Sequence, residues 1–338
     1  MGENMMPVCP GNNNAILVCG GAGYIGSHAV RALRKHGYFP VVFDNLEKGH
    51  LASLPEETPL LHGSLMDMQA LRRAFAEYSF AAAFHFAAFI EVGESVIEPE
   101  RYYHNNVIGA MHLLAAMREA GVRNLVFSST AAVYGDPIAV PIAENHPLRP
   151  VNPYGRSKLI MEEIMADYAL AYQFDITALR YFNAAGADPC AEIGEAHHPE
   201  SHLIPNILKS VLEGGVELKI FGNDYDTPDG TCVRDYIHVC DLAEAHILAL
   251  EHQRRHPGYF AFNLGNGQGF SILEVIAAAE KVTGRKIAYA VHPRRPGDAA
   301  RLVADASLAR ASLDWKPQFT NLEDIVATAW KWHQAPKY

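Results

Sequence analysis

Apolar residues form short runs that alternate with longer amphipathic segments over the first half of the chain. The runs have the length of strands, and the segments between them place apolar residues at helical spacing. Continuous apolar strands joined by helices predict a parallel sheet that is covered by helices on both faces. We therefore expect strands at 15–19, 40–44, 59–63, 82–87, 124–129 and 175–181, with helices at 27–36, 71–78, 107–120 and 159–172.

The pattern changes after about residue 182, where proline, glycine and histidine become frequent. We predict an α/β protein with a Rossmann-type doubly wound parallel sheet at 15–182 and a smaller α/β domain at 183–338. The chain is expected to cross back to the first domain, and residues 1–14 are expected to form a flexible extension. Further strand and helix patterns follow at 218–221, 239–251, 261–264, 271–283 and 322–332.

The composition of the chain argues against several classes of function. The 338 residues fit two domains, and a formal charge of −10 argues against a general nucleic-acid or anionic-membrane binder. No apolar run approaches the roughly 18 residues of a membrane helix, and we expect no signal peptide at the start of the chain. The five cysteines have no metal-binding spacing, which predicts reduced thiols and a cytoplasmic protein.

A glycine-rich run follows the first predicted strand and opens the first predicted helix. Gly21, Gly23 and Gly26 satisfy the GxGxxG pattern, and Gly20 with the last two also satisfies GxxGxxG. Glycines there allow a tight turn and close approach of a pyrophosphate to the amides of the helix start. Asp44 ends the second strand, where a carboxylate accepts hydrogen bonds from ribose hydroxyls and repels a 2′-phosphate. The sequence therefore predicts NAD rather than NADP.

Tyr154 and Lys158 are four residues apart, and on a helix they would share one face. A free tyrosine has a pKa near 10, and a nearby ammonium or an oxidised nicotinamide would lower that pKa and favour the phenolate. Thr130 ends the fifth predicted strand, at the edge where open α/β sheets bind ligands. Its hydroxyl can hydrogen-bond a reacting oxygen, so these three residues are the predicted catalytic group.

Seven segments carry a resemblance to a known family. They are GGAGYIG (20–26), HFAAFIEVGES (85–95), SSTAAVYG (128–135), NPYGRSK (152–158), RYFNAAGADP (180–189), FGNDYDTPDGTCVRDYIHV (221–239) and RRPGD (294–298). Together they resemble the UDP-glucose 4-epimerase family of extended short-chain dehydrogenase/reductases over about residues 15–335. The resemblance implies that Tyr154 takes the proton of the sugar 4-hydroxyl, that Thr130 assists, and that Lys158 tunes the tyrosine. It also implies that NAD accepts the C4 hydride and returns it to the other face of a 4-keto sugar.

The same resemblance implies two sets of binding residues. For NAD they are Gly20, Gly23, Tyr24, Ile25, Gly26, Asp44, Asn45, Ser64, Leu65, Phe86, Ala87, Asn106, Tyr154, Lys158 and Phe182. For the UDP-sugar they are Thr130, Asn183, His202, Leu203, Phe221, Arg234, Arg295, Asp298 and Leu302.

Several positions depart from the family pattern. Ile90 stands where well-known bacterial members have lysine, Ser64 where many have aspartate, and His202 where asparagine is usual. Leu302 falls at the position that gates the substituent on C2 of the sugar, where tyrosine is associated with exclusion of N-acetyl sugars. These departures bear on affinity and sugar choice and leave the Tyr154–Lys158 pair intact.

Other histidines are interpreted as structural. His197, His198 and His202 lie close together in sequence, but no acidic partner is evident beside them and no metal is expected. His85 lies in an apolar strand and is predicted to be a core histidine whose hydrogen bonds are satisfied. The apolar helices at 107–120 and 159–172 resemble those through which the family forms homodimers, so a homodimer is expected.

Three other functions stay open at this stage. A nucleotide-sugar dehydratase or decarboxylase would need a proton donor after Thr130, where Ala131 and Ala132 stand. A non-enzymatic NAD-sensing protein would not need Tyr154 and Lys158. A UDP-xylose/UDP-arabinose or UDP-N-acetylhexosamine 4-epimerase would share the whole catalytic group. The partners expected are thus a UDP-sugar and a second copy of the chain, with no nucleic acid and no membrane.

Overall fold

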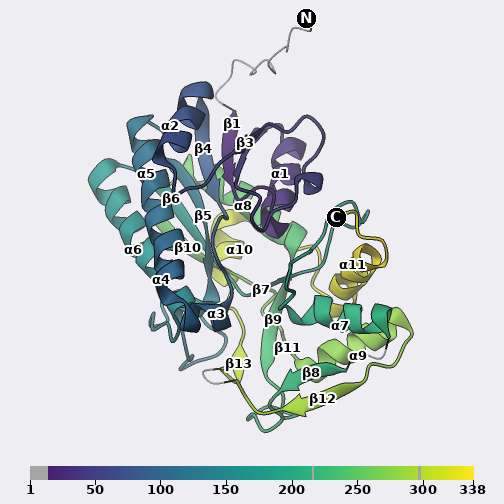
Figure 1. Ribbon diagram of the computed structural model, residues 1–338. Coiled ribbons are helices and arrows are strands. Elements are labelled where there is room, and N and C mark those ends of the chain that lie inside the picture. Colours follow the sequence, from purple (N-terminus) through teal and green to yellow (C-terminus); the bar gives the residue numbers. More distant parts are fainter. Residues whose placement is uncertain (1–13, 215–216, 296–297) are drawn as a thin grey trace, which may run out of the picture.

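The computed structural model describes residues 14–214, 217–295 and 298–338. Residues 1–13 of the predicted N-terminal extension lie outside this described part, as do Pro296 and Gly297 of the RRPGD motif. Seven parallel strands form the main sheet: β1 (Ala15–Cys19), β2 (Phe39–Asp44), β3 (Leu60–His62), β4 (Phe80–His85), β5 (Asn124–Thr130), β6 (Asp175–Tyr181) and β10 (Tyr259–Leu264). Their order is β10-β6-β5-β4-β1-β2-β3 (Figure 1). The predicted Rossmann-type doubly wound fold is confirmed by this order.

Both faces of the sheet are covered by helices because its strands are apolar on both sides. In β1, Ile16 and Val18 belong to one core cluster, whereas Leu17 and Cys19 belong to the other. The first cluster packs under α1 (Tyr24–Lys35), α8 (Val239–Gln253) and α10 (Ser307–Leu313), and the second under α2 (Met68–Glu77), α5 (Gly109–Glu119) and α6 (Pro153–Tyr172). The core of the first part is thus two apolar layers with the sheet between them.

Helix α6 begins at Pro153, six residues before the start at 159 that the apolar pattern predicted. Asn152 accepts a 2.8 Å hydrogen bond from the Gly155 amide through its side chain, and Pro153 occupies the first turn. This start fixes Tyr154 in the first turn and Lys158 one turn further along.

The helix predicted at 107–120 is preceded by an unusual turn. Residues Tyr103–Ile108 form a wide π-helical turn, η2, and the regular helix α5 starts only at Gly109. π-Helical turns are rare and commonly occur at functional sites. Asn106, one of the predicted cofactor residues, lies within this turn.

The second part of the chain is built from short strands and three larger helices. Strand β9 pairs with β11, β13 and β7, and β8 pairs with β12 in a separate two-stranded sheet. These elements are β7 (Asn183–Ala185), β8 (Leu218–Phe221), β9 (Val233–His238), β11 (Gly269–Ser271), β12 (Tyr289–His292) and β13 (Arg301–Leu302), with α7 (Leu203–Glu213), α9 (Ile272–Thr283) and α11 (Leu322–Gln334). Residues of α7, α9 and α11 share one apolar cluster with β8 and β9.

After β6 the chain returns to the main sheet. Helix α8 packs against the main sheet, and β10 pairs with β6 over Tyr259–Leu264. The described chain also contains the short segments α3 (Val92–Ile97), α4 (Pro99–Tyr102), η1 (Leu51–Ser53) and η3 (Ala131–Val133). Among the described residues, no helix combines the length and the apolar character that crossing a bilayer requires.

Candidate active site

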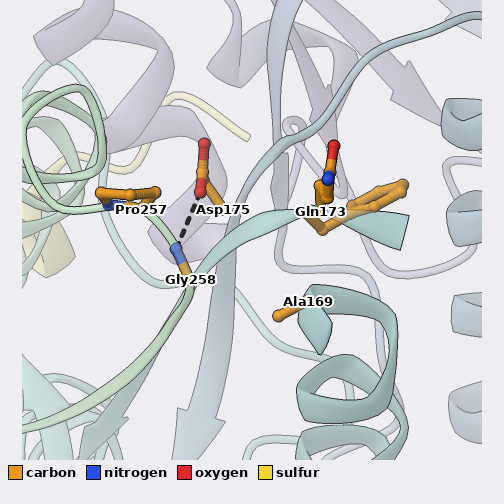
Figure 2. Close-up of a pocket in the computed structure, with 6 residues that line it drawn as sticks. Ala169, Gln173, Asp175, Pro257 and Gly258 are labelled. Carbon is orange, nitrogen blue, oxygen red and sulfur yellow. Dashed lines mark hydrogen bonds between the residues drawn. The ribbon is translucent and has the colours of Figure 1, made fainter. Parts of the chain in front are cut away.

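The residues predicted to bind or react come together at the carboxyl ends of the parallel strands. The glycine-rich turn follows β1, Asp44 ends β2, Thr130 ends β5 and Phe182 follows β6. This edge is where ligands bind in open α/β sheets. A hollow lined by Ala169, Gln173, Phe174, Asp175, Pro257 and Gly258 lies at the opposite edge, where β6 and β10 begin (Figure 2). It contains none of the predicted site residues, so it is not the candidate site.

The glycines of the first turn are required for two different reasons. Gly20 has φ of +79°, and a Cβ there would lie 2.6 Å from the Ala87 nitrogen. At Gly26 a Cβ would lie 2.1 Å from the Gly20 oxygen, so the chain itself demands glycine at both positions. At Gly23 the nearest atom would be the Gly20 oxygen at 3.4 Å, an ordinary contact. The fold alone therefore does not require a glycine at Gly23. A pyrophosphate that approaches the helix start would require it.

Asp44 is buried and holds the glycine-rich turn. Its carboxylate accepts a 3.0 Å hydrogen bond from the Ala22 amide and a 2.8 Å bond from the Leu46 amide. Each oxygen keeps a second acceptor position, so Asp44 can also accept bonds from the two hydroxyls of a ribose. The neighbouring Asn45 is exposed, and its side-chain oxygen accepts a bond from the Glu47 amide.

The other predicted cofactor residues surround the same edge. Phe86 and Ala87 donate their amides to the Cys19 carbonyl, which places the loop after β4 beside the glycine-rich turn. The Tyr24 hydroxyl donates a 2.6 Å hydrogen bond to the Gly186 carbonyl and so joins α1 to the chain after β7. After β3, the Ser64 hydroxyl accepts a bond from the Met66 amide, and the Leu65 carbonyl lies 3.0 Å from His112 Nδ1. Ile25 and Phe182 are partly buried, and Ile90 is exposed.

Asn106 is completely buried, and its side chain makes four hydrogen bonds within the chain. Its oxygen accepts bonds from the Phe89 amide and the Asn105 side chain, and its nitrogen donates to the Phe89 carbonyl and the Ser157 hydroxyl. The amide group is therefore fully used. In this structure Asn106 fastens the loop after β4 to helix α6, which differs from the direct cofactor contact that the resemblance implies.

Tyr154 and Thr130 form the centre of the candidate site. The Thr130 hydroxyl lies close enough to Tyr154 to lower the pKa of the phenol, and the Thr130 oxygen accepts a 3.2 Å bond from the Ala132 amide. Burial, with a smaller contribution from the charge of Glu91, raises the pKa of Tyr154 to about 12 against the lowering effect of Thr130. In the chain by itself the cost of burying a phenolate outweighs any lowering of the Tyr154 pKa by Lys158, so the lowering by the ammonium together with an oxidised nicotinamide stays a prediction.

Lys158 is fully buried one turn after Tyr154. Its ammonium group donates a 2.7 Å hydrogen bond to the Ser128 carbonyl and lies 4.8 Å from the centre of the Phe127 ring. Burial lowers the pKa of Lys158 to about 7, although Glu162 favours the charged form. The lysine is thus poised to change its charge near neutral pH, which is a common property of catalytic lysines.

A buried ion pair that the sequence did not indicate lies beneath this group. Arg180 on β6 contacts both carboxylate oxygens of Glu162 on α6, and both side chains are almost wholly buried. Glu162 also accepts bonds from the Ser129 and Tyr259 hydroxyls. The pair joins α6 to three neighbouring strands, so it fixes the helix that carries Tyr154 and Lys158.

The predicted substrate residues form a second group around β9. Arg234 is paired with Asp298, and Leu302 lies opposite Arg234 in the β9–β13 ladder. The Arg295 guanidinium lies 4.1 Å from the centre of the Phe221 ring. Asn183 donates a 3.0 Å bond to the Asp235 carbonyl, the residue after Arg234. Leu302 and Phe182 pack on the same apolar cluster that contains Ala131, so this group adjoins the end of β5.

Two interpretations of histidines need correction. His85 is buried as expected, but neither ring nitrogen has a hydrogen-bond partner among the described residues, so it is not satisfied. Burial, followed by the charge of Lys158, lowers its pKa to about 3. His197 and His202 also differ from expectation, because Glu195 and Glu200 lie beside both rings. The acids stand in an irregular segment, where sequence spacing gives no indication of contact.

Comparison with known proteins agrees with this geometry. Residues 16–265 match the model of the NAD dependent epimerase/dehydratase family. The chain is 51% identical to a UDP-glucose 4-epimerase of Lactobacillus helveticus, over 95% of this chain and 97% of that protein. It is similar in structure to the UDP-glucose 4-epimerase of Brucella ovis in complex with NAD, with TM-score 0.91, 46% identity, and coverage of 94% and 98% of the two chains. A UDP-Glc/GlcNAc 4-epimerase of Campylobacter jejuni is also similar, with TM-score 0.82, 40% identity, and coverage of 95% and 99%.

Proposed function

The chain belongs to the NAD-dependent epimerase/dehydratase family, and we propose that it is an isomerase that interconverts UDP-glucose and UDP-galactose with NAD as its cofactor. The observation that carries this proposal is the placement of Tyr154 beside Thr130 at the carboxyl end of β5, with Lys158 one turn away on α6. A proton acceptor, a hydroxyl that can orient the reacting oxygen, and a buried cation are what alcohol oxidation at a sugar carbon requires.

The residues would act on the sugar 4-hydroxyl in a defined order. Thr130 would orient the hydroxyl and Tyr154 would accept its proton, because the two side chains are close enough for Thr130 to influence the pKa of Tyr154. The pKa of about 12 keeps Tyr154 protonated in the chain by itself, so proton transfer at neutral pH depends on positive charge brought beside the phenol. Lys158, with a pKa of about 7, supplies part of that charge when it is protonated.

NAD would be held by the glycine-rich turn, by Asp44 and by Lys158. The turn presents the first amides of α1 to the pyrophosphate, and Asp44 accepts bonds from ribose hydroxyls. Once bound, NAD would accept the hydride from the sugar C4 and return it to the opposite face. Asn106 contributes indirectly, since its bonds to Phe89 and Ser157 set the position of the loop that borders the site.

The UDP moiety would be held by the arginines of the second part. Arg234 is paired with Asp298 and the Arg295 guanidinium lies over the Phe221 ring, so both guanidinium groups have a partner within the chain before a ligand arrives. A planar guanidinium donates two parallel hydrogen bonds to a diphosphate. These cations also give an acidic protein the local positive charge that an anionic substrate needs.

The main rival reaction is elimination instead of epimerisation. A dehydratase needs a proton donor beside the leaving hydroxyl, but Ala131 and Ala132 follow Thr130 and carry no acidic group. The deciding experiment is incubation of the purified protein with UDP-glucose, followed by NMR of the sugar. Formation of UDP-galactose without added reductant supports the proposal. A 4-keto-6-deoxy sugar, or no turnover of either sugar, contradicts it.

A second substrate class is favoured by one residue. Leu302 is shorter than tyrosine and lies in the apolar cluster beside Phe182, so the wall there is low and apolar. We propose that UDP-GlcNAc and UDP-GalNAc are also turned over, more slowly than the hexoses. Apolar walls discriminate by only about 1–3 kcal/mol per methylene-sized change, so the preference should be graded.

We also propose that the chain forms a homodimer through α5 and α6 and acts in the cytoplasm. Met111 on α5 and Leu170 on α6 are exposed apolar residues, and Leu170 is 85% exposed. The thiols of the described cysteines are free, as expected in a reducing compartment. Sedimentation of the wild type as a dimer, and of the Met111→Lys, Leu170→Lys double variant as a monomer, would support the interface. The matched control is Ile138→Lys, another exposed position outside these helices.

A further inference from the structure

Four metal-ligating side chains converge in the segment between β7 and α7. Glu195, His197, Glu200 and His202 each offer one ligand atom, and these atoms all lie within 4.8 Å of one another. We refer to these four residues as the Glu/His cluster. His202 is also among the residues expected to contact the UDP-sugar, but the proposed epimerase chemistry makes no use of Glu195, His197 and Glu200, so the cluster calls for a separate explanation.

The distances suit a small tetrahedral site. The His197 Nδ1 atom lies 3.0 Å from Glu195 Oε1 and 4.0 Å from Glu200 Oε1. The His202 Nδ1 atom contacts Glu195 Oε1 and lies 3.7 Å from Glu200 Oε1. A tetrahedral zinc ion binds nitrogen and oxygen ligands at about 2.0–2.2 Å, which separates the ligands by about 3.4 Å. The observed separations lie on both sides of that value.

Charge and burial point to the same conclusion. The side chains of Glu195 and Glu200 are each only 4% exposed. Two buried carboxylates close together repel each other and are costly without positive charge between them. The Lys209 ammonium lies 3.7 Å from Glu200 Oε2, on the outer side of the cluster. A divalent cation bound by two carboxylates and two neutral imidazoles would give a site with no net charge.

Some of the polar atoms of the cluster lack hydrogen bonds. Among the described residues, neither His197 Nδ1 nor Glu200 Oε2 has a hydrogen-bond partner, although both atoms are buried. His197 Nδ1 is near Glu195 but is not directed at it as a hydrogen bond requires. Buried polar atoms without partners are rare in folded proteins, and coordination of a metal ion would satisfy His197 Nδ1, whereas Glu200 Oε2 faces the Lys209 ammonium at 3.7 Å.

The segment that carries the cluster is fixed from several sides. The Ser201 and His202 amides donate hydrogen bonds to Glu200 Oε1. The Trp332 indole donates a 2.9 Å hydrogen bond to the Glu195 carbonyl. His50 Nε2 lies 2.8 Å from the Ala196 carbonyl. Contacts of this kind orient metal ligands before the metal binds.

We propose that Glu195, His197, Glu200 and His202 form a binding site for one divalent transition-metal ion, with Zn²⁺ as the best fit. Four protein ligands close the coordination sphere, so the ion is structural and takes no part in the reaction. His202 directly precedes α7, and the His197 ring packs edge-on against the Tyr24 ring at the start of α1. The ion would therefore fix the segment between the cofactor side and α7.

The competing occupant of the cluster is the proton. Burial lowers the pKa of His202, but Glu195 and Glu200 outweigh that effect and raise it to about 9. Burial likewise raises the pKa of Glu195, but His202 and His197 lower it to about 2. Without a metal, the cluster is an ion pair, and metal binding must displace the imidazole proton. A measurement of bound metal distinguishes these two states.

The test is a metal analysis of the purified, tag-free protein. The protein is exposed to micromolar ZnCl₂, dialysed, and analysed for zinc by mass spectrometry together with His197→Gln, Glu200→Gln and the exposed control His104→Gln. We expect about one zinc per chain in the wild type and control, and an affinity loss of more than about tenfold in the two cluster variants, since even outer-shell changes cost 10–100-fold.

A second measurement uses the wild type alone, so it does not depend on the folding of any variant. Cobalt replaces zinc in tetrahedral sites and then shows intense visible absorption, which octahedral cobalt on a protein surface does not. We expect this absorption to saturate at one equivalent of Co²⁺ and to vanish on addition of Zn²⁺. Less than stoichiometric zinc in the wild type, or equal zinc in His197→Gln, would overturn the proposal. Neither readout depends on epimerase activity.

Discussion

Lys158 on α6 is joined to Ser128 on β5 by a 2.7 Å hydrogen bond from its ammonium group to the main-chain carbonyl oxygen. The bond joins the helix to the strand one turn after Tyr154 and two residues before Thr130, so it fixes the two elements that carry these side chains. A neutral amine can donate the same bond. The lysine therefore keeps its position whether it is charged or not, while its charge changes near pH 7.

The first prediction concerns the pH dependence of stability. The folded chain releases the Lys158 proton near pH 7, whereas the unfolded chain keeps it up to its ordinary pKa of 10.5. Between these values the unfolded state binds more protons, so this residue makes the free energy of unfolding rise with pH, by up to about 1.4 kcal/mol per unit. In Lys158→Met that contribution is removed.

Urea denaturation from pH 7 to 9.5, on protein freed of nicotinamide, measures the difference. As pH rises, we expect the free energy of unfolding of the wild type to increase relative to that of Lys158→Met. Parallel pH profiles for the two proteins would show that Lys158 is protonated throughout the range. The same substitution should lower kcat and weaken retention of NAD(H).

The second prediction concerns the proton acceptor. Tyr154→Phe keeps the ring and its packing but removes the oxygen that takes the proton. We expect kcat to fall by about 10²–10⁴, while UDP binding measured by calorimetry stays as in the wild type. Tyr168→Phe, on the same helix, is the matched control and should retain full activity. If Tyr154→Phe keeps more than about half of the activity, another group is the base.

The third prediction concerns the buried ion pair below the site. Glu162→Gln leaves the Arg180 guanidinium buried without its counter-charge, which typically costs about 3–5 kcal/mol. We expect a correspondingly lower free energy of unfolding in urea. The neighbouring Glu163 is exposed on the same helix, so Glu163→Gln should change stability by less than about 0.5 kcal/mol. If the two substitutions lower the free energy of unfolding equally, the ion pair does not stabilise the packing of α6.

The fourth prediction separates cofactor binding from folding at the glycine-rich turn. A Cβ on Gly23 meets only an ordinary contact within the chain, so Gly23→Ala should fold as the wild type does. The same methyl group would stand where a pyrophosphate approaches the helix start. We expect the wild type to retain NAD(H) through gel filtration and Gly23→Ala to lose it, as measured in the supernatant after denaturation. Gly93→Ala, where a Cβ meets nothing, is the control.

The fifth prediction concerns sugar choice. Leu302→Tyr raises the wall beside Phe182, so turnover of UDP-GlcNAc should fall more than turnover of UDP-glucose. The ratio of the two kcat/KM values is the measurement, and the effect expected is about 10-fold or more. Leu308→Tyr places the same side chain on an exposed position of α10 and should leave the ratio unchanged. An equal loss for both sugars in Leu302→Tyr would mean that Leu302 does not gate the C2 substituent.

Local patterns predicted much of the fold and the chemistry. The sheet strands before residue 182 are apolar runs, so their hydrophobicity identified them, and the Rossmann-type order is confirmed. Asp44 and Thr130 were found because each stands at the end of a strand that the pattern located, and Tyr154 was found from its spacing to Lys158. The family inferred from these motifs is confirmed by the match over residues 16–265.

What sequence could not predict depends on contacts between distant segments. Strands β7, β11 and β13 are two or three residues long, too short for any periodicity to mark them. The pairing of Glu162 with Arg180 joins a helix to a strand, and the pKa of Tyr154 depends on burial. The acids of the Glu/His cluster stand in irregular chain, where neither spacing nor hydropathy indicates that four side chains converge.

The return of the chain to the main sheet has a consequence for biosynthesis. Strand β10 pairs with β6, yet the whole of β7 to α8 is translated between them. At about 5–20 residues per second, β6 leaves the ribosome several seconds before its outer neighbour exists. During that interval the nascent chain presents an unpaired flank on β6, a surface on which chaperones act and to which other strands can add. The catalytic half of this enzyme therefore cannot mature before most of its substrate half has been synthesised.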